Sequence, residues 1–145
     1  QPLRFVVVGD KNICAKIFPY LRWASYITPY GIPPAGKGPA AYIVVLAKKE
    51  SKYAAYDLGA AVENILLTAW GQDIGSCWMQ AIDRKSIKRI LDIPKGLRLD
   101  SIIALGYCDE SPVVEAFKGS VKYWKDKKGT LHVPKRSINQ ILDIG

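Results

Sequence analysis

The stretch AAYDLGAAVENILLTAW, residues Ala54–Trp70, constrains the fold more than any other part of the sequence. On a helical wheel at about 100° per residue, Asp57, Asn64 and Thr68 fall within one narrow arc, and apart from Glu63 the other positions are nearly all apolar. A helix that is apolar on almost every side is buried on almost every side. We predict a helix over residues 52–72, with Ser51 as its N-cap, that has no face for solvent.

The size of the chain limits how such a helix is covered. A chain of 145 residues is the usual size of one domain, and a domain of this size surrounds one helix only with difficulty. A second subunit covers the helix more easily. We therefore predict an obligate homodimer with residues 54–70 in the shared core. The alternative is a central helix within one subunit, covered by a sheet and the other helices.

Apolar, β-branched runs predict strands before and after this helix. The predicted strands cover residues 3–8, 40–47, 75–79 and 99–106. Shorter helices are predicted over residues 11–18 and, after the N-cap Asp83, over residues 84–92. A hairpin is predicted around Lys128 and Gly129; Pro134 interrupts it, and residues 136–143 form a short helix. Residues 20–39 form a long loop rich in proline, glycine and aromatic side chains. This order indicates an α/β or α+β architecture.

The composition excludes several classes of function. No run of about 18 apolar residues is free of charge, so no transmembrane span is predicted. Neither a P-loop nor a usual nucleic-acid-binding motif is present, and we expect neither nucleic acid nor a membrane as a partner. Three cysteines, an odd number with wide spacing, fit neither a disulfide framework nor a zinc site. We interpret Cys14, Cys77 and Cys108 as buried, reduced thiols of a cytoplasmic protein.

The net charge of +8 is concentrated near the C-terminus. The basic residues there are Lys118, Lys122, Lys125, Lys127, Lys128, Lys135 and Arg136. They form either a solvated basic surface or a surface that contains a phosphate site. One functional hypothesis is therefore a non-catalytic module that binds an anionic partner through residues 118–136.

Three segments together resemble the nitroreductase family of flavoproteins. They are YDLGAAVENILLTAWGQDIGSCWMQAID, LDIPKGL and SIIALGYCDESP, and the likeness covers nearly the whole chain. The resemblance implies one nitroreductase-like domain over residues 1–145, folded as an α+β three-layer sandwich with a mostly antiparallel sheet. It also implies a domain-swapped homodimer with one FMN in each of two interface sites, and it places the apolar helix at the centre of that dimer.

The chain departs from the family pattern at its beginning. The family's N-terminal RxSxR motif, which binds the flavin phosphate, has no counterpart here. The chain starts at Gln1, directly before the strand-like LRFVVV. We therefore expect the natural protein to have a segment upstream of Gln1. We also expect a version extended upstream to bind FMN more tightly than the chain that starts at Gln1.

The resemblance assigns two groups of residues to FMN. The segment SCWMQAID matches the family segment that lies along the flavin ring, so Trp78, Met79, Gln80 and Ala81 are expected to present backbone N–H groups to it. Arg136, with Lys135 beside it, matches the family's C-terminal basic position at the FMN phosphate, for which a guanidinium fork is well suited.

We predict structural roles for the remaining candidate residues. His132, the single histidine, is interpreted as structural because the cofactor performs the difficult step of this chemistry. Cys77 is interpreted as a small buried residue beside the flavin segment. No metal site and no catalytic side chain are predicted.

The resemblance implies an FMN-dependent oxidoreductase that takes a hydride from NADH or NADPH onto flavin N5. The electrons then pass to an oxidised acceptor such as a nitroaromatic or a quinone. Two alternatives remain open. One is a flavin-fold protein with another activity, either dehalogenation or breakdown of the flavin itself. The other is the non-catalytic basic module described above.

Overall fold

The computed structural model describes residues 2–29, 31–48 and 52–143. The chain divides into two compact units. Unit 1 contains residues 1–22 and 34–108, and unit 2 contains residues 23–33 and 109–145. Each unit has its own sheet.

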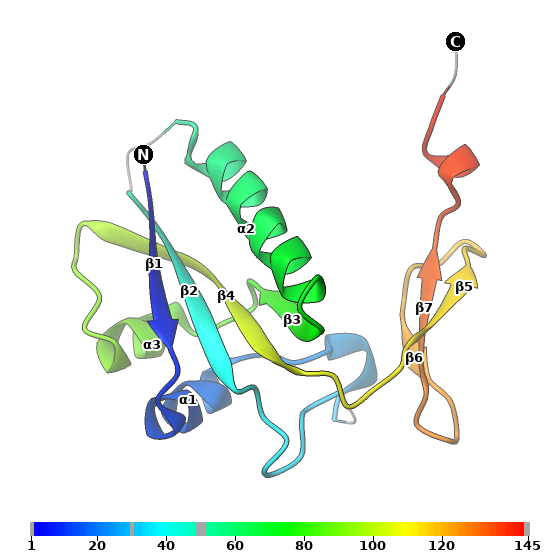
Figure 1. The fold of residues 1–145 in the computed structure, drawn as a ribbon, viewed down its shortest axis with the longest axis horizontal. Helices are drawn as coiled ribbons and strands as arrows, with labels where there is room; N and C mark the ends of the chain where they lie inside the picture. Colours follow the sequence, from blue (N-terminus) through cyan, green and yellow to red (C-terminus); the bar gives the residue numbers. More distant parts are fainter. Residues whose placement is uncertain (1, 30, 49–51, 144–145) are drawn as a thin grey trace. The chain divides into compact units, whose positions relative to one another are not determined.

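Unit 1 is built on a four-stranded antiparallel sheet in the order β1-β2-β4-β3 (Figure 1). The strands are β1 (Leu3–Val8), β2 (Ala41–Lys48), β3 (Ile74–Met79) and β4 (Leu97–Tyr107). Strands β2 and β4 lie in the centre and supply most of the buried residues, because their runs are apolar on both faces. All four strands were predicted from the sequence, to within two residues at each end.

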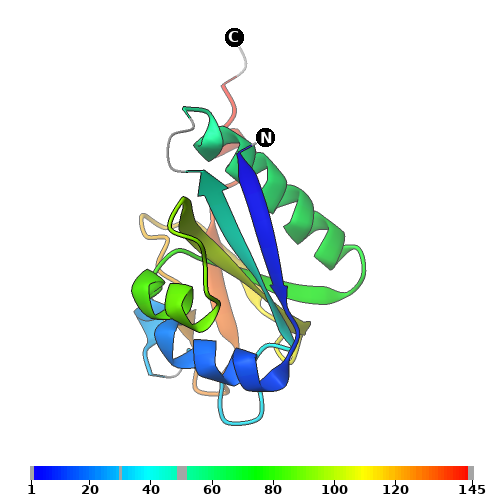
Figure 2. The same cartoon turned by 90° about the vertical axis from the view of Figure 1, so that its left-hand side faces the viewer.

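Helices cover both faces of this sheet, so that unit 1 has three layers (Figures 1 and 2). Helix α2 (Ala54–Trp70) packs on one face, where Leu58 and Val62 contact Val45 and Ile103 in a buried cluster. Helices α1 (Lys11–Ile17) and α3 (Arg84–Ile90) cover the other face. An α+β layered fold with an antiparallel sheet is therefore confirmed.

In a single chain, helix α2 has one buried side and one exposed side. Leu58, Val62 and Ala69 are buried against the sheet, whereas Tyr56 is 77% exposed and Trp70 is 74% exposed. Among the described residues of unit 1, no other helix covers this exposed side, so the alternative of a helix enclosed within one subunit is wrong. The helix begins at Ala54, with Tyr53 as N-cap and no side-chain cap bond; Ser51 lies outside the described residues.

Unit 2 contains a three-stranded sheet in the order β5-β7-β6. Its strands are β5 (Val113–Ala116), β6 (Trp124–Lys125) and β7 (Leu131–Lys135). Strands β6 and β7 form the predicted hairpin, in which Gly129 has φ +84° and the Asp126 side chain accepts hydrogen bonds from the N–H groups of Lys128 and Thr130. The parallel strand β5 was not predicted.

Two sequence expectations for unit 2 are wrong. Pro134 does not interrupt the strand but lies within β7, opposite Glu115 of β5. The short strand β6 pairs only with Leu131 and His132, so proline removes no hydrogen bond on that side. The expected C-terminal helix is a single 3-10 turn, η3 (Ile138–Gln140), in which Ser137 and Gln140 form a capping box.

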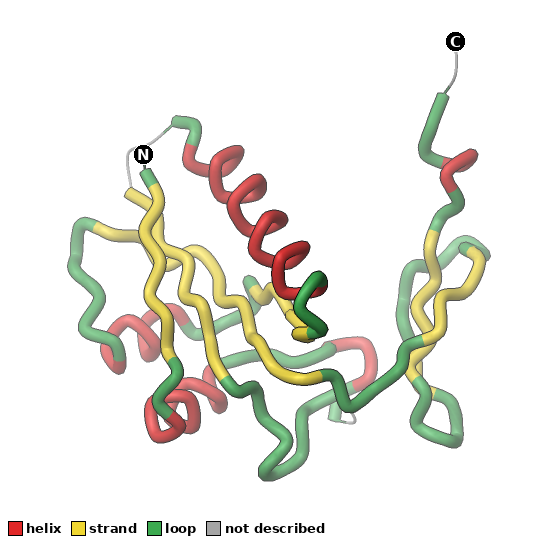
Figure 3. The backbone as a smooth tube through the Cα atoms, viewed as in Figure 1, coloured by secondary structure: helices red, strands yellow, loops and turns green. Residues whose placement is uncertain are grey.

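The long loop between α1 and β2 contains two further 3-10 turns, η1 (Phe18–Tyr20) and η2 (Ser25–Ile27) (Figure 3). Gly31 is required in this loop, because a Cβ atom there would lie 2.4 Å from the Cβ of Ala24. The loop starts in unit 1, runs through unit 2 over residues 23–33 and returns to unit 1.

Candidate functional site

The first group of predicted site residues lies where β3 ends and the chain turns toward α3: Trp78 and Met79 are the last residues of β3, and Gln80 and Ala81 follow them. β3 is an edge strand of the sheet, and its pairing with β4 ends at Met79, opposite Ile102. The chain then turns into α3, whose N-cap is Asp83. The Asp83 carboxylate accepts hydrogen bonds from Lys85 N–H at 3.0 Å and Ser86 N–H at 3.1 Å, as predicted for an N-cap.

The side chain of Ser86 completes this cap. Its Oγ donates a 2.8 Å hydrogen bond to Asp83 Oδ2. This bond, with the N–H bond of the same residue, holds the pKa of Asp83 below its usual value. The start of α3, and with it the end of the β3–α3 segment, is therefore fixed by an ionised carboxylate at neutral pH.

The backbone of residues 79–83 is held by the beginning of the long loop. Leu21 and Ile82 form an isolated antiparallel bridge. Arg22 N–H donates to the Ala81 carbonyl at 3.0 Å, and Asp83 N–H donates to the Tyr20 carbonyl at 2.9 Å. This bridge could not be predicted from local sequence patterns, because its two sides are about sixty residues apart in the chain.

The hydrogen bonds leave two donors of this segment unused. The carbonyl of Gln80 accepts from Ile82 N–H at 3.0 Å, and that of Ala81 accepts from Arg22. Within the described ranges, however, the N–H groups of Gln80 and Ala81 have no backbone acceptor. Their side chains are exposed, Trp78 is 40% exposed, and Met79 is buried in the core. Two adjacent backbone donors beside an exposed indole suit a flat ligand with acceptor atoms on its edge.

The second group of predicted residues, Lys135 and Arg136, lies in unit 2. Both are exposed at the end of β7, where the Lys135 carbonyl accepts from Phe117 N–H at 3.0 Å. The Arg136 guanidinium lies 5.1 Å from the centroid of the Phe117 ring. Both residues line a groove of about 490 Å³, together with Val114, Glu115, Ala116, Phe117, Ser137 and Gln140. A guanidinium held on an aromatic ring at the wall of a groove suits a phosphate.

The lysines of the hairpin are placed differently. Lys125 forms an ion pair with Glu110, and the side chains of Lys127 and Lys128 are exposed at the turn. None of the three lines the groove at Arg136. The sequence prediction separated Arg136 from these lysines, and the structure places them in separate parts of unit 2.

His132 lies in a polar cluster that the sequence did not predict. Its ring stacks on Trp124 with centroids 4.2 Å apart. Its Nδ1 lies 2.9 Å from Glu115 Oε1, and its Nε2 lies 3.5 Å from Asp126 Oδ2. Hydrogen bonds from Thr130 and Lys128 N–H, together with His132, hold the pKa of Asp126 below its usual value. These contacts join β5, β6 and β7, in agreement with the structural role predicted for His132.

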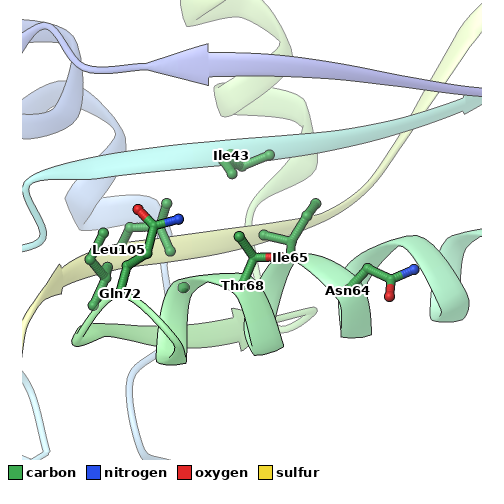
Figure 4. A pocket seen from close by; sticks show the side chains of 8 residues that line it. Ile43, Asn64, Ile65, Thr68, Gln72 and Leu105 are labelled. Atoms are coloured by element: carbon green, nitrogen blue, oxygen red, sulfur yellow. The ribbon is translucent and has the colours of Figure 1, made fainter.

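An apolar groove of about 390 Å³ separates α2 from part of the sheet (Figure 4). Ile65 and Thr68 lie on the side of α2 that faces Ile43 of β2, and Gln72 lies beside Leu105 of β4. Ile74, Ala69 and Asn64 complete the lining. The sheet and α2 alone therefore do not fill the space between them.

Two of the three cysteines are not buried, contrary to the sequence expectation. Cys14 is buried and its thiol lies 3.4 Å from the Val8 carbonyl, whereas Cys77 and Cys108 are exposed. Cys77 is on the edge strand β3, and Cys108 follows β4 with its sulfur over Gly75. All three are free thiols. In the part of the chain described, no helix is long and apolar enough to cross a membrane.

The sequence profile of the nitroreductase family matches residues 1–107. The match covers the whole four-stranded sheet, its three helices and residues 79–83, and it ends at the last residue of β4. The chain therefore belongs to the nitroreductase family, which classes it with oxidoreductases. Lys135 and Arg136 lie beyond the matched residues.

Individual relatives agree with this classification. A protein of Archaeoglobus fulgidus named "Putative NADH dehydrogenase/NAD(P)H nitroreductase" is 34% identical over 125 residues, which are 80% of this chain and 67% of that protein. An FMN-dependent nitroreductase structure from Clostridium difficile R20291 is 27% identical, with a TM-score of 0.59, and the match covers 81% of this chain and 69% of that one.

A nitroreductase family structure from Clostridium novyi NT is 25% identical, with a TM-score of 0.58, and the match covers 73% of this chain and 62% of that one. This chain thus spans between three fifths and seven tenths of the length of these relatives.

Proposed function

We propose that this chain functions in a cytoplasmic homodimer as an FMN-dependent oxidoreductase that takes electrons from NADH or NADPH and passes them to a small oxidised acceptor. The observation that carries the proposal is the segment at residues 79–83, where Gln80 and Ala81 offer adjacent unused N–H groups within the matched family region. Bound FMN would supply the hydride chemistry, taking a hydride at flavin N5 and releasing electrons to a nitroaromatic or a quinone.

The residues at this segment fit the flavin ring system. The edge of oxidised flavin carries acceptor atoms at N5 and O4, and backbone N–H groups are donors whose positions are fixed by the fold. We propose that Trp78, Met79, Gln80 and Ala81 hold the ring through their backbone. A donor at O4 would favour electron transfer to the ring, because it stabilises the charge that this atom gains, whereas a donor at N5 would stabilise the oxidised ring.

We further propose that Arg136 binds the FMN phosphate and that Lys135 supports it. Arg136 carries a fixed positive charge at a groove, and its stacking on Phe117 limits the directions its N–H groups take. Unit 1 and unit 2 together then form one functional domain over residues 1–145. The homodimer is supported by the uncovered outer side of α2, on which Tyr56, Leu67 and Trp70 are exposed.

The first test is reconstitution of the chain with FMN. We expect a yellow protein with the absorption bands of oxidised flavin, which NADH or NADPH bleaches and a quinone or nitroaromatic restores. Failure to bind FMN would contradict the proposal. Binding without turnover of NADH and quinone would favour a flavin protein with another activity.

The second test separates the ring contacts from the phosphate contacts. Removing a charge-assisted bond to phosphate costs about 1.5–3 kcal/mol, so Arg136→Ala should weaken FMN binding at least about tenfold. Riboflavin lacks the phosphate, and its affinity should not change. Lys127→Ala is the matched control, because its solvated ammonium contributes well under about 1 kcal/mol. Fluorescence titration measures all four affinities, and equal losses for both flavins would refute the phosphate assignment.

A further inference from the structure

Strand β4 extends past the end of its neighbour β3. β4 begins at Leu97 and pairs with β2 from there to Leu105, whereas its pairing with β3 ends at Ile102. A bulge between Val45 and Leu46 of β2 adds one residue, Asp100, to β4 at this place. Leu99 and Asp100 are buried, so their carbonyl groups need hydrogen-bond donors from another source than β3.

Arg84, the first residue of α3, supplies these donors. Its Nε donates to the Leu99 carbonyl at 3.2 Å, and its Nη2 donates to the Asp100 carbonyl at 2.8 Å. The same Nη2 lies 3.0 Å from the Gln80 carbonyl. One guanidinium therefore takes the place that a longer β3 would occupy, and it joins β4 to the segment proposed to lie along the flavin.

The bond to Gln80 determines the direction of a neighbouring donor. The carbonyl of Gln80 and the N–H of Ala81 belong to one planar trans peptide group and point in opposite directions. The Arg84 guanidinium and the Ile82 N–H both donate to the Gln80 carbonyl and so fix its direction. The Ala81 N–H therefore points to the opposite side of the peptide, away from Arg84. Had β3 continued instead, donors of this segment would have paired with the carbonyls of β4.

We propose that Arg84 is a positioning residue that turns the Ala81 N–H toward the flavin ring. The inference rests on the proposed function, since it assigns Arg84 a role at the same flavin segment. Arg84 does not touch the flavin; it acts through the Gln80–Ala81 peptide. A lysine at this position has one ammonium in place of the fork, so it cannot bind three carbonyl groups in this arrangement.

The test compares Arg84→Met, Arg84→Lys and the control Lys85→Met. Lys85 is the next residue of α3, with an exposed side chain. In flavin-free protein, the NMR amide signals of Gln80, Ala81 and Ile82 should shift in Arg84→Met and stay in place in Lys85→Met. In titrations, Arg84→Met should weaken FMN and riboflavin equally, by about tenfold, as expected for one lost hydrogen bond to the ring. Arg84→Lys should fall between wild type and Arg84→Met.

The midpoint potential of bound flavin supplies a readout that a purely structural role would leave unchanged. It should shift in Arg84→Met, because a lost donor changes the relative stability of the oxidised and reduced ring, and remain unchanged in Lys85→Met. If Arg84→Met fails to fold, Arg84→Lys provides the same comparison.

Unchanged amide signals, unchanged affinities, or a loss for FMN without a loss for riboflavin would overturn the role of Arg84 alone. Failure of the wild-type chain to bind either flavin would instead overturn the proposed function and the flavin part of this inference with it.

Discussion

The two faces of the four-stranded sheet are covered to very different degrees. On the face of α1 and α3, Tyr42, Val44 and Ile102 are almost completely buried. On the face of α2, Phe5 and Val7 follow Leu3 at strand spacing, yet Val7 is 73% exposed. The groove between α2 and the sheet lies on this second face. The face of α1 and α3 is therefore a well-packed core, whereas the face of α2 stays partly exposed in a single chain.

The largest expected effect is the difference in stability between a charged residue on the buried side of α2 and one on its exposed side. Val62 is fully buried in the cluster of α2 and the sheet, so Val62→Asp should destabilise the chain by at least about 3–5 kcal/mol and leave it largely unfolded. Leu67 is 60% exposed on the other side of the same helix, so Leu67→Asp should remain folded. Circular dichroism during urea unfolding measures both.

Sedimentation of the same two variants tests the proposed homodimer. Wild-type chain should sediment as a dimer, and Leu67→Asp should sediment as a folded monomer. A wild-type chain that is monomeric and folded at micromolar concentration would show that the open face is left to solvent, and the dimer proposal would then be wrong.

Truncation of a side chain on the covered face should also cost substantial stability. Ile87 of α3 is fully buried, and Ile87→Ala should lower the free energy of unfolding by about 2–5 kcal/mol, because it leaves a cavity in a filled layer. The same measurement on Leu67→Ala is the control on α2, for which we expect less than about 1 kcal/mol in the isolated chain. Equal losses would mean that the two faces are equally well packed.

An isosteric change compares two strand valines. Val44→Thr places a hydroxyl on the covered face, where Val44 is fully buried, and should cost about 1–3 kcal/mol. Val7→Thr places the same hydroxyl on the open face and should cost less than about 0.5 kcal/mol in a monomer. A larger cost for Val7→Thr that depends on protein concentration would indicate that a second subunit covers this residue.

The smallest effect concerns pH at the N-cap of α3, on the covered face. Because the pKa of Asp83 is lowered in the folded state, its contribution to stability is fully present above the unfolded-state pKa and is lost as pH falls through the folded one. Asp83→Asn should therefore be less stable than wild type at pH 7, and the difference between the two should shrink as the pH falls below about 4. Parallel denaturation curves for wild type and variant at every pH would contradict this.

The elements of unit 1 could be predicted from the sequence because each is encoded locally. The apolar runs of β2 and β4 and the cap at Asp83 are signals of a few adjacent residues. The sequence also indicated correctly that α2 has no polar side, and from this we predicted that the helix is buried on all sides. The structure shows that such a pattern also describes a helix whose second side one chain leaves uncovered.

The candidate site could be predicted from the sequence only in part. Resemblance selected residues 78–81, whereas the contacts that hold them come from Arg22, Arg84 and Tyr20, which carry no signal until the chain is folded. The exposure of Cys77 was missed because it depends on β3 being an edge strand. The parallel strand β5 was missed because a four-residue strand without alternation resembles a loop.

The division of the chain into units limits which parts of this sequence could be exchanged by recombination. The backbone passes between unit 1 and unit 2 at residues 22–23, 33–34 and 108–109. Tyr26 of the loop packs on Tyr123 in unit 2, with ring centroids 5.0 Å apart. A gene fusion that replaced everything after residue 108 would therefore leave residues 23–33 behind without their neighbours. An exchange that keeps unit 2 whole would have to include two separate stretches, residues 23–33 and 109–145, with 75 residues between them.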